Sequence, residues 1–382
     1  MSDLQSYLAG FEVETGYLNW ASFGPLSVAV REEARADEEL SASGRPSGID
    51  LVASHVDEAR ALVASMLGAD ADEVTLAPST TDAMFHALFG LSGTVLLSPN
   101  EYPTIPVAAR RAADFRDLLS VRDLDRTITR VTPDAVRAAL TDEVTAVAVS
   151  LVDYRTGYVA DLPALREVVG DRLLIVDAIQ GFGVVDTDWA AADVVAGHGY
   201  KWIRAGRGTG FARFSARARE RITPVLAGVA GTAAELGDLE VGEPRDGAAA
   251  YAISRPDPQA AGRLSAALRE VTDAGVPAIA ALVAEKARRV MEIADSHGIP
   301  VLTDRDRHAG IVALTPEPER TGAIAAGLVN AGITATVRGG IVRISPHAGT
   351  SDDAFGLLDA ALAASRIGPD VAPPSVPLPL EP

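Results

Sequence analysis

The chain has 382 residues, of which 48% are hydrophobic and 23% charged, a composition typical of globular proteins. Its formal net charge of −18 disfavours nucleic acid and anionic membranes as partners, because both select basic surfaces. It contains no cysteine, which excludes disulfides, thiolate metal sites and a cysteine nucleophile. No apolar run is long enough to span a membrane and no secretory signal opens the sequence, so we expect a soluble, cytoplasmic protein.

The first two thirds of the chain alternate between helical and strand-like segments. Strand-like apolar runs cover residues 73–77, 94–98, 144–150, 173–176 and 192–196. Helical segments lie before or between them, at residues 50–67, 82–91, 103–113, 133–140 and 162–169. This alternation predicts an α/β fold with a mostly parallel sheet covered by helices on both faces. Such sheets bind ligands at the carboxyl ends of their strands.

The pattern changes after about residue 228. A weakly periodic segment is followed by a long helical stretch, residues 258–297, with a break near residues 275–277. Shorter strands and helices follow, at residues 310–314, 321–331, 341–345 and 352–364. This order predicts a smaller C-terminal α/β domain. We therefore divide the chain into an N-terminal segment packing with the small domain, a large domain, the small domain and a proline-rich tail: residues 1–15, 16–250, 251–366 and 367–382.

Lysine occurs only at positions 201 and 286, while arginine dominates the basic residues. Lys201 follows an apolar run and is flanked by Tyr200 and Trp202, a setting that lowers the pKa of an amine by desolvation. A primary amine that can lose its proton forms an imine with an aldehyde, which the permanently protonated guanidinium cannot do. Lys286 lies on an ordinary charged helix face. The alternative for Lys201 is a surface lysine in a glycine-rich loop.

Three further groups lie at strand ends or helix starts. Asp177 ends a buried strand, and a buried carboxylate needs a cation or several hydrogen-bond donors. A protonated pyridine nitrogen would be such a cation. The equally good alternative is that Asp177 caps the helix or turn after the strand. Residues 79–82, Ser-Thr-Thr-Asp, begin a helix and suit an anion, or simple capping. Arg343 alternates with apolar residues on a strand and suits a substrate carboxylate, or a structural salt bridge.

Together these groups resemble the fold type I pyridoxal-phosphate enzymes, and within them the class V aminotransferase group, over nearly the whole chain. The resemblance implies that Lys201 is the catalytic lysine carrying the cofactor and that Asp177 and Gln180 contact its ring nitrogen and 3-hydroxyl. It further assigns cofactor contacts to Thr80, Thr81, Tyr102, His198 and Tyr200, with Tyr102 stacked on the ring and the role of His198 open. Asn19, in the N-terminal signature of residues 17–22, and Arg343 are implied to bind the substrate, and no metal is implied.

Within this group, three local features lean toward the kynureninase-like branch: residues 102–104, residues 154–157 and the tyrosine before the lysine. Cysteine desulfurases of the common kind need a cysteine to receive sulfur, and this chain has none. The resemblance therefore implies chemistry on an amino acid through an external aldimine and a Cα carbanion, leaning to a β-lyase. Aminotransferase and epimerase activities stay open as alternatives, and a protein that only binds the cofactor is the reading we disfavour.

The group often takes a phosphate contact from a partner subunit, which implies a homodimer. Thr232, after Gly231, is the candidate for that contact, although the glycine–threonine context typical of the group is poorly matched near residues 245–255.

Overall fold

A computed structural model describes residues 3–233 and 240–365 of the chain. The predicted proline-rich tail, residues 367–382, lies outside the described residues. In the described part, no helix is both long and apolar enough to cross a membrane. The residue bounds predicted for the domains stay a prediction.

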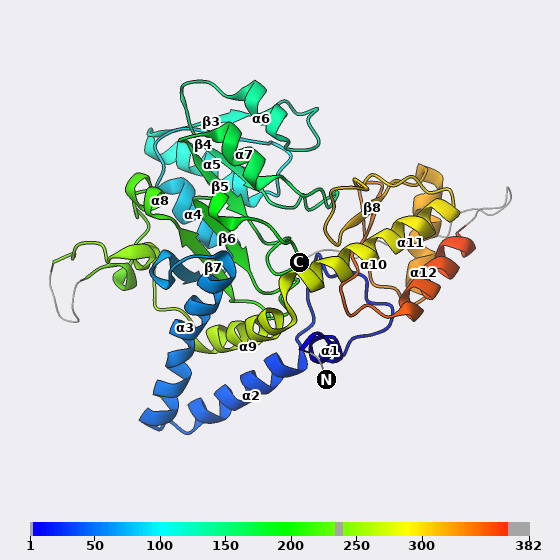
Figure 1. Cartoon of the computed structure of the whole chain (residues 1–382), viewed down its shortest axis with the longest axis horizontal. Helices are drawn as coiled ribbons and strands as arrows, with labels where there is room; N and C mark the ends of the chain where they lie inside the picture. The colour runs from blue at the N-terminus through cyan, green and yellow to red at the C-terminus, as the bar shows by residue number, and fades with distance from the viewer. Residues whose placement is uncertain (1–2, 234–239, 366–382) are drawn as a thin grey trace.

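A seven-stranded sheet forms the centre of the larger part of the molecule (Figure 1). Its strands, in the order β1-β7-β6-β5-β4-β2-β3, are β1 (Val74–Ala77), β2 (Gly93–Leu97), β3 (Leu119–Asp123), β4 (Val144–Ser150), β5 (Leu173–Asp177), β6 (Val194–His198) and β7 (Gly210–Phe214). All neighbouring pairs are parallel except those of β7, which runs antiparallel to both β1 and β6. The mostly parallel α/β sheet predicted from the sequence is therefore confirmed.

Both faces of this sheet are buried, as the strand β5 shows. Leu174 and Val176 belong to one hydrophobic cluster, whereas Leu173 and Ile175 belong to a second cluster on the opposite face. Successive side chains of a strand point to opposite faces, so a strand buried on both sides reads as a continuous apolar run. The helices of this part are α2 (Val28–Ala42), α3 (Pro46–Leu67), α4 (Thr80–Phe89), α5 (Thr104–Arg116), α6 (Pro133–Ala139), α7 (Leu162–Val169), α8 (Ala216–Arg221) and α9 (Pro258–Ala274). Of these, α2 packs against α3 and α9 rather than against the sheet.

The predicted break in the long helical stretch is confirmed. The helix α9 ends at Ala274, and α10 (Val276–Ser296) begins immediately afterwards. Gly275 between them has a φ of 83°, a conformation that suits glycine, and Pro277 stands in the first turn of α10, where its missing N–H costs nothing. The chain thus changes direction between the helices and leads into the C-terminal part (Figure 1).

The C-terminal part contains a second, three-stranded sheet of order β8-β10-β9, and all of its pairs are antiparallel. Its elements are β8 (Val312–Leu314), α11 (Pro318–Asn330), β9 (Thr336–Arg338), β10 (Ile341–Ile344) and α12 (Asp352–Ala364). The N-terminal segment returns to this part after α1 (Asp3–Ala9), because Tyr17 and Asn19 form β-bridges with Thr334 and Ser345. Leu18 is buried in the C-terminal hydrophobic cluster.

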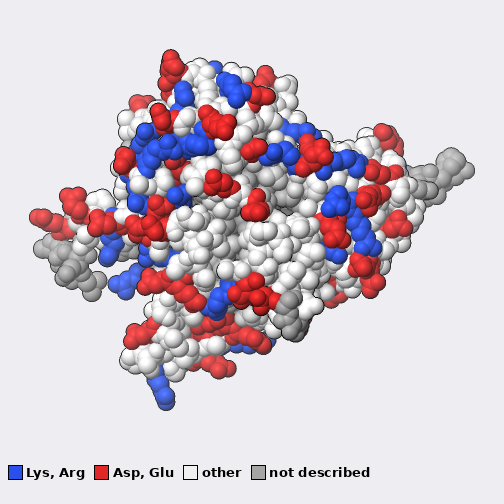
Figure 2. Space-filling view, viewed as in Figure 1, with Lys and Arg blue, Asp and Glu red and all other residues white. Residues whose placement is uncertain are grey.

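The charges of the chain are spread over its surface. On the face drawn in Figure 2, acidic and basic side chains are interspersed, and uncharged residues cover much of the centre. Many of the arginines form ion pairs with neighbouring acids, such as Arg110 with Asp123 at 2.9 Å and Arg305 with Asp295 at 2.7 Å. Exposed pairs of this kind contribute little to stability, about 0–1 kcal/mol each.

Candidate active site

Asp177 is the last residue of β5 and is almost fully buried. One of its oxygens, Oδ1, accepts a hydrogen bond from the backbone N–H of Ile179 at 3.0 Å. Burial raises the pKa of this carboxyl to about 6, although the Ile179 N–H and the charge of Lys201 act in the opposite direction. The site therefore holds a carboxylate that a further cation or donor would stabilise strongly.

Lys201 follows the neighbouring strand β6 and is 7% exposed. Burial lowers the pKa of its ammonium group to about 8, while Asp177 raises this pKa and Arg343 lowers it. Asp177 carries the opposite charge and Arg343 the same charge, which accounts for the direction of each effect. The lysine amine therefore loses its proton much closer to neutral pH than an exposed lysine would.

Two tyrosines lie beside the lysine amine, and a third packs against one of them. Its Nζ lies 5.9 Å from the ring centroid of Tyr102 and 5.5 Å from that of Tyr200. Tyr102 is half exposed and packs edge-on against Tyr154 at 5.2 Å, so its ring borders an opening to solvent. The sequence had suggested Tyr102 and Tyr200 as site residues, and the structure places both beside Lys201.

The helix α4 begins beside this cluster with the Ser-Thr-Thr-Asp sequence. Ser79 caps the helix, since its Oγ accepts the backbone N–H of Asp82 and donates to the Asp82 carboxylate. Thr81 contacts Thr104 through their hydroxyls at 3.1 Å. Thr80 is buried, and its hydroxyl has no hydrogen-bond partner among the described residues. Because a buried hydroxyl is costly without a partner, the helix start suits an anion that Thr80 and free N–H groups would bind.

His198, the last residue of β6, links this helix start to the lysine. Its Nε2 lies 3.1 Å from the carbonyl oxygen of Pro78, and its Nδ1 accepts the N–H of Tyr200 at 3.0 Å. Burial lowers the pKa of His198 to about 4, so the ring is neutral and donates through Nε2. Both ring nitrogens are thus used within the protein, and the ring lies edge-on to Tyr200 at 4.6 Å.

Gln180 lies in the loop after Asp177 and contacts Trp202, the residue that follows Lys201. Its side-chain carbonyl accepts the indole N–H of Trp202 at 2.8 Å, and its amide donates to the carbonyl of Ala21 at 3.0 Å. The amide has a second N–H, so Gln180 can still donate one hydrogen bond.

Arg343 is brought to the site by the central strand β10 of the small sheet. Its guanidinium donates to the Tyr154 carbonyl at 2.8 Å and to the Ser22 hydroxyl at 2.7 Å, with the Thr336 hydroxyl at 3.5 Å. Its Nε is buried and has no partner among the described residues, and burial lowers its pKa. No carboxylate of the described residues pairs with Arg343, so it is a cation that suits an anionic ligand.

Asn19 joins this group indirectly. Its side-chain oxygen accepts from the hydroxyls of Ser22 at 2.8 Å and Thr336 at 2.9 Å. Ser22, Thr336 and the Tyr154 carbonyl are contacts of Arg343 that the sequence did not indicate, because they come from three distant segments. Ser22 belongs to the N-terminal signature of residues 17–22 and Tyr154 to residues 154–157, but nothing in the sequence linked either of them to Arg343.

The backbone under Lys201 is fixed by the N-terminal segment. The N–H of Gly24 donates to the carbonyl of Tyr200 at 2.8 Å. A Cβ atom added to Gly24 would lie 1.8 Å from the Lys201 carbonyl oxygen, so only glycine fits at this position.

Thr232, the residue predicted to contact the phosphate, is not brought to Lys201 within one chain. Its hydroxyl donates to the Val229 carbonyl at 3.3 Å, and it forms a bridge with Pro244.

Glu101, next to Tyr102, was not singled out as a site residue, yet burial raises the pKa of its carboxyl to about 7. Its Oε1 accepts the backbone N–H of Ser150 at the end of β4.

The arrangement combines an amine of lowered pKa, a buried carboxylate, an anion-binding helix start and an arginine without a carboxylate partner. Residues 43–345 of the chain match the family model described as Aminotransferase class-V. The chain is 30% identical to a kynureninase of Deinococcus radiodurans over 233 residues, which is 58% of this chain and 55% of that protein.

Other relatives carry other names. An uncharacterized aminotransferase, YcbU of Bacillus subtilis, is 28% identical over 148 residues, or 36% of this chain and 39% of its own length. The cysteine desulfurase IscS of Rickettsia rickettsii is 26% identical over 183 residues, or 45% of this chain and 44% of its own length. The chain thus spans about half or less of the length of these relatives.

Solved structures show the same fold. An apo cysteine desulfurase from Thermococcus onnurineus NA1 superposes with a TM-score of 0.79 at 19% identity, covering 90% of this chain and 92% of that one. The cystine C-S lyase C-DES, in complex with its product cysteine persulfide, gives a TM-score of 0.83 at 20% identity, covering 95% and 100%. At these identities the likeness concerns the fold.

Proposed function

Because the chain belongs to the class V aminotransferase family, we propose that it is a pyridoxal-phosphate-dependent enzyme that transforms an amino acid. The observation that carries this proposal is the buried pair of Asp177 and Lys201 at the carboxyl ends of neighbouring strands. This is the edge of a parallel sheet where ligands bind, and the amine there has a pKa of about 8.

The residues present fit this cofactor. The partnerless hydroxyl of Thr80 and the first turn of α4 suit a phosphate, together with Thr81 and the hydroxyl of Tyr200. Asp177 suits a protonated ring nitrogen, because it is a buried carboxylate with one backbone donor and one nearby amine. Gln180 has an N–H left for the 3-hydroxyl.

When bound, pyridoxal phosphate supplies an aldehyde that condenses with amines and a protonated ring that withdraws electrons from the attached carbon. Tyr102 would support the ring of the cofactor, and Asp177 would stabilise a protonated ring nitrogen. Lys201 is the residue that would hold the cofactor, and its amine, when neutral, would accept the proton from the substrate Cα. A pKa near 8 suits this proton transfer, because the amine is partly neutral at physiological pH.

Arg343 binds the substrate carboxylate, and Asn19 orients the hydroxyls of Ser22 and Thr336 that support the guanidinium. Binding energy at the carboxylate orients the Cα proton toward the lysine amine. His198 acts as a positioning residue in this scheme, because it ties the loop before α4 to the backbone of Tyr200.

For the reaction itself, we propose a lyase-side reaction, either β-elimination of the C–S lyase type or cleavage of the side chain of the kynureninase type. The support is the kynureninase name of the 30% identical relative, together with the local Tyr102-Pro103-Thr104 and Tyr154-Arg155-Thr156-Gly157 sequences. Tyr154 lies between two of the proposed binding residues, because its ring packs on Tyr102 and its carbonyl accepts a hydrogen bond from Arg343.

Two measurements test these proposals. Reduction of the loaded enzyme with borohydride, followed by peptide mass spectrometry, should place the cofactor on Lys201. Lys201→Ala should lose this label, whereas Lys286→Ala, which changes the other lysine, should keep it. A label that persists in Lys201→Ala would overturn the assignment.

Product analysis then decides the reaction. Incubation with cysteine conjugates, without an acceptor, should release the thiol together with ammonia and pyruvate, whereas kynurenine and water should give anthranilate and alanine. Turnover that instead requires a 2-oxo acid acceptor would replace the lyase by an aminotransferase, and loss of optical activity without new products would indicate an epimerase.

We also propose a homodimer in which Thr232 contacts the cofactor phosphate of the partner copy. Each of the two variants Lys201→Ala and Thr232→Val would impair its own homodimer. Mixed dimers should regain activity, because one of their two sites then contains neither substitution. No regain after mixing, with dimers formed, would exclude the contact.

A further inference from the structure

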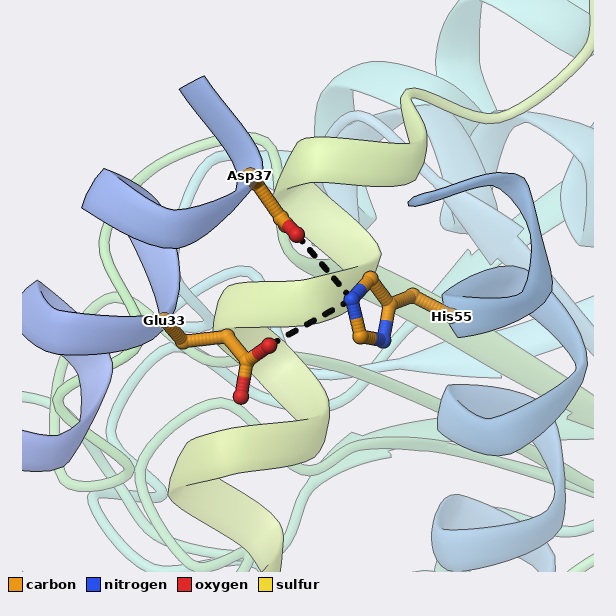
Figure 3. Close-up of side chains that lie close together, drawn as sticks. All are labelled: Glu33, Asp37 and His55. Atoms are coloured by element: carbon orange, nitrogen blue, oxygen red, sulfur yellow. Dashed lines mark hydrogen bonds and ion pairs between the residues drawn. The ribbon is translucent and has the colours of Figure 1, made fainter. Parts of the chain in front are cut away.

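A second cluster of polar side chains lies between α2, α3 and α9, outside the site described above. Glu33 and Asp37, one turn apart on α2, both point to the ring of His55 on α3 (Figure 3). We propose that Glu33, Asp37 and His55 bind a divalent transition-metal ion, and that zinc is the ion that suits the site best.

The spacing of the three side chains fits a metal ion. The Nε2 atom of His55 lies 3.1 Å from Asp37 Oδ1 and 3.4 Å from Glu33 Oε1, and the three ligand atoms lie within 4.8 Å of one another. Zinc binds imidazole and carboxylate at about 2.0–2.1 Å, so two ligands of a tetrahedral zinc ion stand roughly 3.3 Å apart. Both distances from Nε2 are close to this value, and the fourth position would be left for water.

Asp37 supplies an independent sign that a ligand is missing. Its side chain is 1% exposed, and its Oδ2 has no hydrogen-bond partner among the described residues. A carboxylate oxygen buried in this way is costly unless a cation or a donor reaches it.

A glycine lets helix α9 pack closely against the cluster. Gly262 of α9 faces Asp37 and His55, and a Cβ atom there would lie 2.4 Å from Asp37 Oδ2 and 3.0 Å from the His55 ring. Any other residue at this position would clash with the carboxylate.

The surrounding residues orient His55 as a metal ligand. On the far side of the ring, Nδ1 lies 3.3 Å from Glu58 Oε2. An N–H at Nδ1 that donates to Glu58 leaves the lone pair of Nε2 directed at Asp37 and Glu33, which are themselves acceptors. A carboxylate behind a ligating histidine is the arrangement that fixes the ring in metal sites.

The charges of the cluster point the same way. Arg269 of α9 pairs with both Glu33 and Glu58, at 2.8 Å to the former. Three carboxylates and one guanidinium leave two negative charges around the ring of His55, and a divalent cation balances them. One nitrogen and two oxygen ligands favour zinc and its first-row neighbours over calcium and magnesium, which prefer oxygen alone.

The ion would be structural. It would join α2 to α3, and α9 packs over both through Gly262 and Arg269. The same helix α9 carries Arg263, which donates to the carbonyls of Ala205 and Arg207 in the segment after Lys201. Metal binding would therefore stabilise the position of α9, which holds the segment after Lys201, although the ion itself would not contact the substrate.

The test is zinc binding by the full-length, cofactor-loaded protein after treatment with a chelator. Equilibrium dialysis followed by elemental analysis should find one zinc ion per chain, and calcium should not compete. Glu58→Gln should weaken zinc binding by about 10- to 100-fold, as loss of a carboxylate behind a ligating histidine does. Asp37→Asn and His55→Gln should abolish it, and Glu38→Gln, an exposed neighbour on α2, should leave it unchanged.

The wild-type protein alone can overturn the proposal, whatever the variants do to folding. Fewer than one tenth of a zinc ion per chain, with a melting temperature that zinc does not raise, would mean that the three side chains only pair with one another. Equal zinc binding by wild type, Asp37→Asn and His55→Gln would place the ion elsewhere.

Discussion

Asp177 and Lys201 leave the ends of the adjacent strands β5 and β6, and each favours the charged form of the other in a buried setting. Burial nevertheless dominates both groups. It raises the pKa of the carboxyl to about 6 and lowers that of the amine to about 8. In the cofactor-free site, the Asp177 carboxylate and the Lys201 ammonium group are therefore both charged at neutral pH, although burial destabilises each of them. A bound ligand that pairs with these groups would reduce this desolvation cost.

Replacing Asp177 by Asn should stabilise the cofactor-free protein at alkaline pH while abolishing turnover. The pKa of Asp177 is about 6 in the folded chain and 3.8 ordinarily, so its ionised form costs stability. That cost is absent below pH 4 and complete above pH 6, where it amounts to roughly 2–3 kcal/mol. The asparagine oxygen can keep the hydrogen bond from Ile179.

Urea denaturation of the cofactor-free proteins at pH 8 and pH 4.5 measures this difference. Asp186→Asn, an exposed aspartate after the same strand, should show no gain at either pH. A loss of stability in Asp177→Asn at pH 8 would contradict the prediction.

The amine of Lys201 should react with acylating reagents in a pH-dependent way, with a midpoint at about pH 8 in the cofactor-free protein. Burial lowers the pKa, so the neutral, reactive amine predominates above that pH. Asp177→Asn should move the midpoint lower, because the carboxylate raises the pKa of the amine. Pulse labelling with acetic anhydride and mass spectrometry of the peptides reports the rate, with Lys286 as the internal reference.

Thr80→Val should weaken binding of pyridoxal phosphate by about 10- to 100-fold, since one hydrogen bond to a charged phosphate would be lost. Binding of pyridoxal, which lacks the phosphate, should not change. The cofactor-free variant should be at least as stable as wild type, because the buried Thr80 hydroxyl has no partner among the described residues. Fluorescence titration with both ligands separates the phosphate contact from general damage, which would affect both equally.

Arg343→Lys should keep its cofactor but lose preference for substrates that carry a carboxylate. Lysine lacks the planar fork that binds a carboxylate through two N–H groups, so KM for an amino acid should rise by about 100-fold. Spectral titration with cysteine and cysteamine, which differ by the carboxylate, provides the matched pair. The variant should bind the two equally, and an unchanged preference for cysteine would remove Arg343 from substrate binding.

The sequence predicted the central strands well, because β4 and β5 are apolar on both faces and a parallel sheet requires that pattern. It did not predict β3, an edge strand with mostly exposed residues, or β7, whose glycine and Arg213 interrupt the apolar run. The helix α2 was missed as well, because its residues 31–39 are dominated by charged side chains and little of it is buried. Tertiary pairing rather than local propensity forms these elements.

The candidate site divides in the same way. Asp177, Lys201 and Thr80 were predictable, since scarcity, strand ends and a helix start mark them in the sequence. The contacts of Arg343 were not, because Ser22, Tyr154 and Thr336 meet only when the N-terminal segment crosses to the small sheet. His198 acquires its positioning role from the Pro78 carbonyl, a partner that no spacing in the sequence reveals.

The contact between Gly24 and the carbonyl of Lys201 has a consequence for engineering this protein. Because the N-terminal segment packs directly on the backbone of Tyr200 and Lys201, even a single methyl group at position 24 would displace the reactive amine without altering any polar side chain. Libraries that vary the first 25 residues to improve expression or solubility would therefore change catalytic geometry unintentionally, and position 24 should be held constant in them.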